Sequence, residues 1–285
     1  MATKFSPTQR LERAYAKGIQ SIVRRVLTPI LPGQSLDDWL AGLADRTRAA
    51  DVQEASDLLA RRMIYWVDVK NARTWREAAA KSQRSRELYR LLQHEMAGPT
   101  GVTLTRLVQA NAKYISSLPL VAAEHLVHEV RQAQQAGSRP ATVAKMMRAR
   151  FPELLRSRVH LISRTETSKA SAALTEARAE ELDLPVYRWR TSKDARVRDS
   201  HRLMEGVVVF YAHPPSPEKL DGLSSTLGHY HAGQAPNDRC YQEPVLSLDD
   251  LSFPARVYDW RSDSIVHMNK QPFKELATQL TGRAA

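Results

Sequence analysis

A chain of 285 residues, 42% hydrophobic and 26% charged, has the balance of a globular protein and is long enough for one large domain or two smaller ones. No stretch approaches the roughly 20 apolar residues that cross a bilayer, so no membrane partner is expected, and the single cysteine, Cys240, excludes an internal disulfide and fits a reducing cytoplasm. The net charge of +11, from 42 Lys and Arg against 31 Asp and Glu, favours a polyanion or an acidic protein surface as partner, although an ordinary well-solvated basic surface explains it equally well.

The first hundred residues are predicted to be helical. Apolar residues recur at helical spacing between Pro7 and Pro29. Ser35 can cap a second helix whose first turn is acidic. A third helix is expected over 52–66 and a fourth over about 75–96, which ends at a Gly-Pro pair.

Prolines and glycines divide the helices expected in the middle of the chain. One apolar stripe is predicted to end before Pro119, and the next ends at Gly137. Ser138 can cap a further helix, and Pro152 begins a long helix that runs to about Leu182.

Basic residues crowd the third and fourth of these helices. They form a candidate contact with DNA phosphates or an acidic partner, although scattered charges on amphipathic helices more often form a solvated face. The candidate contact residues are Arg73, Arg76, Arg84 and Arg86.

The composition changes after Leu184. Residues 186–190 alternate as a strand does, 207–211 form a second apolar run and 240–246 can form a third strand. The intervening loop is rich in Pro, Ser, Gly and His, and a short helix is expected near 273–280. The predicted fold is therefore mainly α with a small C-terminal α+β lobe: a helical N-terminal half, a long helix, then a short β-rich lobe.

This pattern predicts three domains. A helical N-terminal region covers 1–118, a domain of helices followed by a small β lobe covers 119–248, and a C-terminal tail covers 249–285. The tail is expected to wrap a neighbour or to end in the short helix. Strands are predicted only after Pro185.

Polar residues are concentrated in the small lobe. If 191–201 is helical, Asp194, Arg198 and His201 fall on one face. Together with Asp238 and Cys240, they include ligand types that zinc accepts, so a metal site would use Asp194, His201, Asp238 and Cys240. The spacing matches no common zinc module, and a metal-free hydrogen-bonded network is the favoured interpretation.

An ordered series of residues in 160–246 resembles the phage Mu F-like minor head protein family, also called the phage head morphogenesis domain. A helix with Arg164-Thr165-Glu166-Thr167 is followed by a tryptophan, an Asp-Ala-Arg-Val-Arg run with a histidine, a glycine before an apolar strand, and a late Pro-Asn/Arg-Cys motif. The motif residues are Arg164, Glu166, Trp189, Asp194, Arg196, Arg198, His201, Gly206, Asn237, Arg239 and Cys240.

One departure from the family concerns metal binding. The family's late motif usually reads Asn-Cys-Arg-Cys, and this chain has Asn237-Asp238-Arg239-Cys240. If two cysteines bind metal in relatives, Asp238 must supply an oxygen ligand here. We expect Asp194, Arg196, Arg198, His201, Arg239 and Cys240 to lie close together, because buried polar groups need one another.

The resemblance implies a minor capsid protein of a tailed bacteriophage with no catalytic residues and no cofactor. Such a protein acts in procapsid assembly in the bacterial cytoplasm, inside the head near the portal, and in genome packaging or ejection. Its implied partners are the portal protein and inner head or scaffold components, with non-specific DNA contact.

Two other classes of function remain open at this point. A metal-dependent hydrolase or nuclease would use Asp194, His201, His229 and His231 to activate water on a cation. A DNA-binding protein without a capsid role would use the basic surface. ADP-ribosyl transfer is a weaker idea, because only the Arg164-Thr165-Glu166 run suggests it and the rest of a nucleotide pocket is absent.

Overall fold

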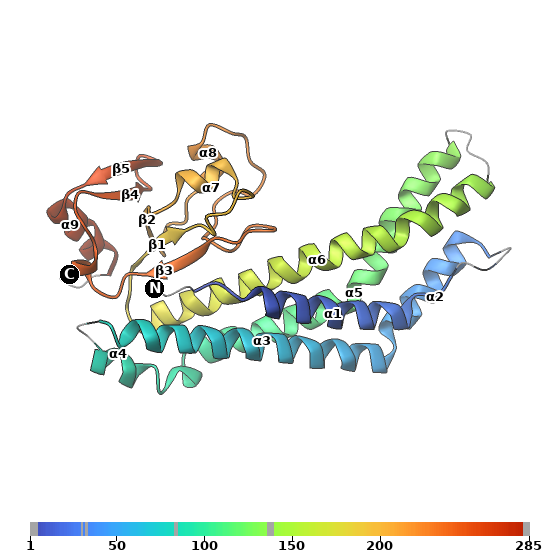
Figure 1. Ribbon diagram of the computed structural model, residues 1–285, viewed down its shortest axis with the longest axis horizontal. Helices are drawn as coiled ribbons and strands as arrows, with labels where there is room; N and C mark the ends of the chain where they lie inside the picture. Colours follow the sequence, from blue (N-terminus) through green and yellow to red (C-terminus); the bar gives the residue numbers. More distant parts are fainter. Residues whose placement is uncertain (1–4, 30, 32–33, 83–84, 136–139, 282–285) are drawn as a thin grey trace. The chain divides into compact units, whose positions relative to one another are not determined.

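The computed structural model describes residues 5–29, 31, 34–82, 85–135 and 140–281. Its helices are α1 (Gln9–Val26), α2 (Leu36–Arg48), α3 (Ala50–Ala79), α4 (Ser85–Leu91), α5 (Pro99–Gln135), α6 (Pro140–Glu181), α7 (Asp199–Leu203), α8 (Pro217–Leu220) and α9 (Lys270–Thr281) (Figure 1). Its strands are β1 (Val186–Arg190), β2 (Val208–Phe210), β3 (Tyr241–Pro244), β4 (Ala255–Asp259) and β5 (Ser264–Met268), and 3-10 turns lie at Glu95–Ala97 and Leu248–Asp250.

The order of these elements confirms the predicted fold class. Among the described residues, every regular element before Pro185 is helical and the first strand begins at Val186. The alternation of 186–190 places β1 at the bounds that the sequence predicts. β2 and β3 lie inside the predicted ranges 207–211 and 240–246.

The helix boundaries predicted around Trp75 and Pro119 are wrong. Trp75 does not begin a fourth helix but lies fully buried near the end of α3, which continues because its apolar face continues. Pro119 lies inside α5. Proline removes one helical hydrogen bond, and the buried side chains on either side of it, Leu118 and Ala122, compensate by packing.

Pro152 likewise does not begin a helix, because α6 already starts at Pro140 and runs through it. Packing after the proline explains the continuity, since Leu155 and Val159 are both buried. The predicted helix end at Gly137 and the predicted cap at Ser138 lie outside the described residues.

The chain divides into two compact units that are discontinuous in sequence. Unit 1 comprises Met1–Thr8, Trp66–Thr105 and Arg164–Ala285, and unit 2 comprises Gln9–Tyr65 and Arg106–Ser163. α3, α5 and α6 each contribute residues to both units. The division therefore differs from the three domains expected from the sequence, whose first boundary falls within α5.

Unit 2 is built from helices alone within the residues described for it. α1 buries Ile19 and Val26 completely, and α2 buries Leu43. The buried hydroxyl of Tyr15 in α1 donates a hydrogen bond to Asn111 Oδ1 in α5, 3.0 Å away. These contacts give the unit an apolar interior in which Tyr15 and Asn111 pair with each other.

Unit 1 contains a five-stranded sheet in the order β3-β1-β2-β4-β5. All neighbouring pairs are antiparallel except β2 and β4, which are parallel. β4 and β5 lie in 249–285, where the sequence predicted a tail, so most of that segment is part of the lobe (Figure 1). The short helix expected near 273–280 is present within α9.

Side chains of the strands alternate between two buried faces. On one face Val186, Phe210 and Val257 pack with Phe273 of α9. The other face carries a second cluster, which includes Trp189. The members of this second cluster are Tyr187, Trp189, Met204, Val207, Val209, Tyr230, Ala232, Ala235, Cys240 and Tyr258. The polar site described next adjoins this second face.

Within the described part of the chain, no helix has the length and apolar character needed to cross a bilayer.

Candidate functional site

The centre of the polar site is the turn that precedes β3. Asp238 is only 4% exposed, and its two carboxylate oxygens accept backbone N–H bonds from Cys240 and Gly233, both at 2.8 Å. Asn237 adopts a left-handed conformation with φ of 59°, which asparagine tolerates better than most residues. The carboxylate therefore organises the turn from inside.

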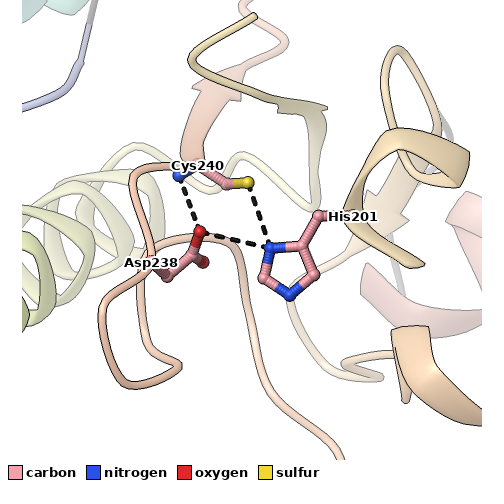
Figure 2. Close-up of side chains that lie close together, drawn as sticks. All are labelled: His201, Asp238 and Cys240. Atoms are coloured by element: carbon pink, nitrogen blue, oxygen red, sulfur yellow. Dashed lines mark hydrogen bonds and ion pairs between the residues drawn. The ribbon is translucent and has the colours of Figure 1, made fainter. Parts of the chain in front are cut away.

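His201 of α7 meets this turn. Its Nδ1 lies 3.3 Å from Cys240 Sγ and 3.2 Å from Asp238 Oδ1 (Figure 2). Its Nε2 lies 2.9 Å from the hydroxyl of Tyr230, and that hydroxyl donates to Glu218 Oε1 at 2.7 Å. In the described residues, His201, Asp238 and Cys240 are the group of three or more His, Cys, Asp or Glu side chains that could hold a metal ion.

Two aromatic side chains, Trp189 and Tyr230, pack against the His201 ring. Trp189 of β1 is fully buried and meets the His201 ring edge to face, with ring centroids 5.6 Å apart and an interplanar angle of 79°. Tyr230 lies 5.9 Å from the same ring. His201 itself is 2% exposed, so the cluster is shielded from solvent.

Burial determines the protonation of the groups around His201. Burial, reinforced by the Asp238 carboxylate, raises the pKa of Cys240 above that of a free thiol. Burial also favours a higher pKa for Asp238, but hydrogen bonds from His201 and the Cys240 amide outweigh it, and the net pKa of Asp238 is lowered. Without a bound cation, Asp238 is therefore ionised and Cys240 is a neutral thiol at neutral pH.

Asp194 belongs to a second, more exposed group. It pairs with Arg239 at 2.6 Å and accepts the backbone N–H of Arg196 at 2.9 Å. Residues 191–198 are not helical, and α7 begins only at Asp199. The predicted shared helical face for Asp194, Arg198 and His201 is therefore wrong, because the Asp194 side chain hydrogen-bonds to its local backbone instead.

The remaining motif residues fix the turn to its surroundings. Arg198 Nη2 donates to the carbonyl of Pro236 at 2.7 Å, and Arg164 of α6 donates to Asn237 Oδ1 at 2.7 Å. Gly206 has a φ of 78° and donates its N–H to the Trp189 carbonyl at 2.8 Å. That conformation favours glycine, which explains a glycine two residues before β2.

Glu166 is largely buried in α6, 3.5 Å from Lys169 Nζ. Burial raises its pKa, and the nearby lysine partly counters this effect. The glutamate therefore has an ion-pair partner one helical turn away, as expected for a mid-helix acidic residue that is largely buried.

The histidines invoked for a hydrolase do not converge. His229 Nδ1 lies 2.9 Å from the carbonyl of Pro214, whereas His231 lies against Tyr187 and 3.9 Å from Glu176. Burial lowers the pKa of His231 to about 4, so it is neutral at physiological pH. Neither histidine belongs to the His201 group.

Sequence reasoning missed Tyr230 and Glu218. Tyr230 lies between two histidines that drew attention as metal ligands, and Glu218 lies in the one-turn helix α8 within a segment predicted to be loop. No local sequence pattern identifies either residue. Tyr230 reaches His201, and Glu218 reaches Tyr230, only once the chain has folded, because these residues are distant in sequence.

We expect His201→Ala to destabilise unit 1 by roughly 1–3 kcal/mol, because Asp238 and Tyr230 each lose a buried hydrogen-bonding partner. Chemical denaturation of purified protein measures this loss. His267→Ala on β5 is the matched control, since that histidine is exposed and its replacement should leave stability close to wild type. Equal stability of the two variants would refute a structural role for His201.

Comparison with known proteins finds a similarity to one family over part of the chain. Residues 124–243 match the family model described as phage Mu protein F like protein. A segment of 144 residues, half of this chain, is 33% identical to an uncharacterized protein of Haemophilus influenzae, and it spans 30% of that relative's length. No solved structure matches the chain. The matched segment includes α7, Trp189 and the turn at 236–240, so residues 124–243 of this chain are similar to the phage Mu protein F-like family.

Proposed function

We propose that this protein is a minor head morphogenesis protein of a tailed bacteriophage, with a structural rather than a catalytic role. The observation that carries the proposal is the family match over 124–243, which includes all of the long helix α6, the strands β1 and β2, and all but the last residue of β3. The burial of the polar cluster supports a structural role. At 2–4% exposure, His201, Asp238 and Cys240 offer a substrate no access.

The proposed site of action is the inside of the head near the portal, during procapsid assembly, with consequences for genome packaging or ejection. Exposed apolar side chains on α3 support a protein contact of this kind. Leu58, Tyr65, Trp66 and Val69 are all between 39% and 67% exposed and recur at helical spacing. Large exposed apolar side chains gathered on one helix are typical of protein–protein contacts.

The net charge of +11 supports a second, weaker contact with DNA. Arg73 and Arg86 are exposed, although Arg73 pairs with Glu77 at 2.8 Å and Arg76 lies 3.9 Å from Glu95. Arg84 lies outside the described residues. Phosphate contacts release counterions, so such binding should weaken by orders of magnitude between roughly 50 and 200 mM salt if several phosphates are engaged.

Charge reversal of this basic segment tests both contacts. We expect a variant with Arg73, Arg76, Arg84 and Arg86 changed to glutamate to lose DNA binding at low salt. Binding of the portal protein from the same genome is measured separately by co-expression and size-exclusion chromatography. The matched control reverses four exposed arginines of α1 with the same change in net charge: Arg10, Arg13, Arg24 and Arg25.

The outcomes separate the candidate surfaces. Loss of DNA binding with portal association intact would place the basic segment against the genome and the portal contact on the apolar helix faces. An equal loss of DNA binding in the test variant and in the α1 control would mean that net charge alone, and not the basic segment, causes the loss. If DNA binding and portal association both survive in the fourfold variant at Arg73, Arg76, Arg84 and Arg86, the basic segment is only a solvated face.

A further inference from the structure

The hydrogen bonds around His201 require a positive charge at its Nδ1. Tyr230 has one hydroxyl proton, and its oxygen lies 2.7 Å from Glu218 Oε1. A carboxylate is the stronger acceptor, so the Tyr230 oxygen must accept its second hydrogen bond, which comes from His201 Nε2 at 2.9 Å. This arrangement assigns the imidazole proton to Nε2.

With that proton on Nε2, the lone pair of Nδ1 faces two further electron-rich atoms. Asp238 Oδ1 lies 3.2 Å from Nδ1 and Cys240 Sγ lies 3.3 Å from it (Figure 2). A carboxylate oxygen and a ring lone pair repel each other unless a cation lies between them. The cation is either a second imidazole proton or a metal ion.

The arrangement of the three donor atoms favours the metal. Zinc binds imidazole nitrogen at about 2.0–2.1 Å and sulfur at about 2.3 Å in a tetrahedron, which puts neighbouring ligand atoms about 3.2–3.6 Å apart. The two separations from Nδ1, 3.2 Å to the Asp238 oxygen and 3.3 Å to the Cys240 sulfur, fit two edges of such a tetrahedron. A metal-free network needs two separate protons, one shared between Nδ1 and Asp238 and one on the Cys240 thiol that donates to Asp238, whereas one zinc ion accounts for the convergence of all three donors.

The surroundings also resemble those of bound metal ligands. A metal-ligating histidine usually donates its other ring N–H to a carboxylate or to a group linked to one, and here Tyr230 links His201 Nε2 to Glu218. The Asp238 carboxylate is held by the amides of Gly233 and Cys240. All three donor side chains are buried.

We propose that His201, Asp238 and Cys240 bind a zinc ion that joins α7 to the turn before β3. Nδ1, one Asp238 oxygen and the Cys240 sulfur are three ligands, and a water molecule is the fourth, because no further His, Cys, Asp or Glu among the described residues belongs to the group. Cys240 binds as the thiolate and releases its proton to solvent on zinc uptake. The ion joins two segments separated by 36 residues of mostly irregular chain.

The experiment measures zinc in the full chain purified without added metal. Elemental analysis should find about one zinc per chain, and a strong chelator should lower the melting temperature, which stoichiometric zinc then restores. Replacement by cobalt should give a sulfur-to-cobalt charge-transfer absorption that Cys240→Ser lacks. A protein free of zinc as purified, with melting unchanged by chelator and by added zinc, would overturn the proposal.

Variants distinguish a specific site from adventitious metal. Tyr230→Phe keeps the ring and removes the hydroxyl that positions His201, so zinc affinity should fall about 10- to 100-fold. Asp194→Asn is the matched control, because Asp194 pairs with Arg239 beside the site but lies outside the donor group. Undiminished zinc in both His201→Ala and Cys240→Ser would also overturn the proposal. Portal association is a separate readout, so failure here leaves the proposed head function untouched.

Discussion

Replacing Arg178 with alanine is expected to lower the free energy of unfolding of unit 1 by about 3–5 kcal/mol. Arg178 of α6 is fully buried, and its guanidinium contacts Glu95 at 2.7 Å, Asp68 at 2.6 Å and Asn71 at 2.7 Å. Removing the guanidinium leaves the Glu95 carboxylate, itself 6% exposed, buried without its close ion-pair partner, while Arg76 lies at the longer distance of 3.9 Å. Leaving one charge of a buried ion pair without its close partner costs more free energy than the ion pair itself contributes to stability.

Urea denaturation of the purified chain measures this loss. Arg73→Ala is the matched control, since Arg73 is on α3 with an exposed side chain and a single i,i+4 ion pair to Glu77, a type of pair that adds little to stability. Arg178→Lys should recover only part of the loss, because one ammonium group cannot replace the planar set of donors. A loss below about 1 kcal/mol for Arg178→Ala would mean that the buried network does not form.

Replacing Phe273 with alanine is also expected to cost about 3–5 kcal/mol. Phe273 is fully buried, and its ring centroid lies 5.6 Å from those of Phe210 in β2 and Phe253. Removing the ring therefore opens a cavity against one face of the sheet. The same measurement of unfolding applies, and Gln271→Ala on the exposed side of α9 should change stability little.

The Phe273 variant also tests the role of 249–285. If this segment were a tail that wraps a neighbouring protein, Phe273→Ala would leave the isolated chain as stable as wild type. A cooperative loss of stability instead places α9 within the core of the lobe.

Local signals explain the parts of the fold that the sequence predicts correctly. The alternation of 186–190 locates β1, and the capping side chain of Ser35, which accepts the backbone N–H of Asp38, marks the start of α2. β4 and β5 carry weaker patterns. β5 in particular buries only Met268 fully, so it has no apolar alternation and depends on its pairing with β4.

Proline misled the sequence analysis for a physical reason. A proline costs a helix about 3 kcal/mol in isolation, which made Pro119 and Pro152 plausible breaks. Tertiary packing of the apolar side chains along α5 and α6 outweighs that cost. Propensity alone cannot show this, because the packing partners are distant in sequence.

The candidate site was only partly predictable. His201 and Cys240 lie together as the sequence predicts. Asp194 contacts two other members of the predicted group, Arg239 and Arg196, but it lies outside the group of donors around His201. The burial of Arg178 is not predictable from the sequence, because a charged residue on a long helix is usually solvated. Its acidic partners lie 83 and 110 residues away in the chain, a separation at which no sequence spacing reveals a contact.

Quantitative mass spectrometry of procapsids, purified from bacteria that express the complete head genes of the encoding phage, is the most direct test of a head morphogenesis role. The chain should be recovered in procapsids together with the portal protein, in a few copies per particle, and should remain bound after a salt wash that removes non-specific DNA contacts. Procapsids that contain the portal but lack this chain, with the chain left entirely in the soluble fraction, would contradict the proposed function.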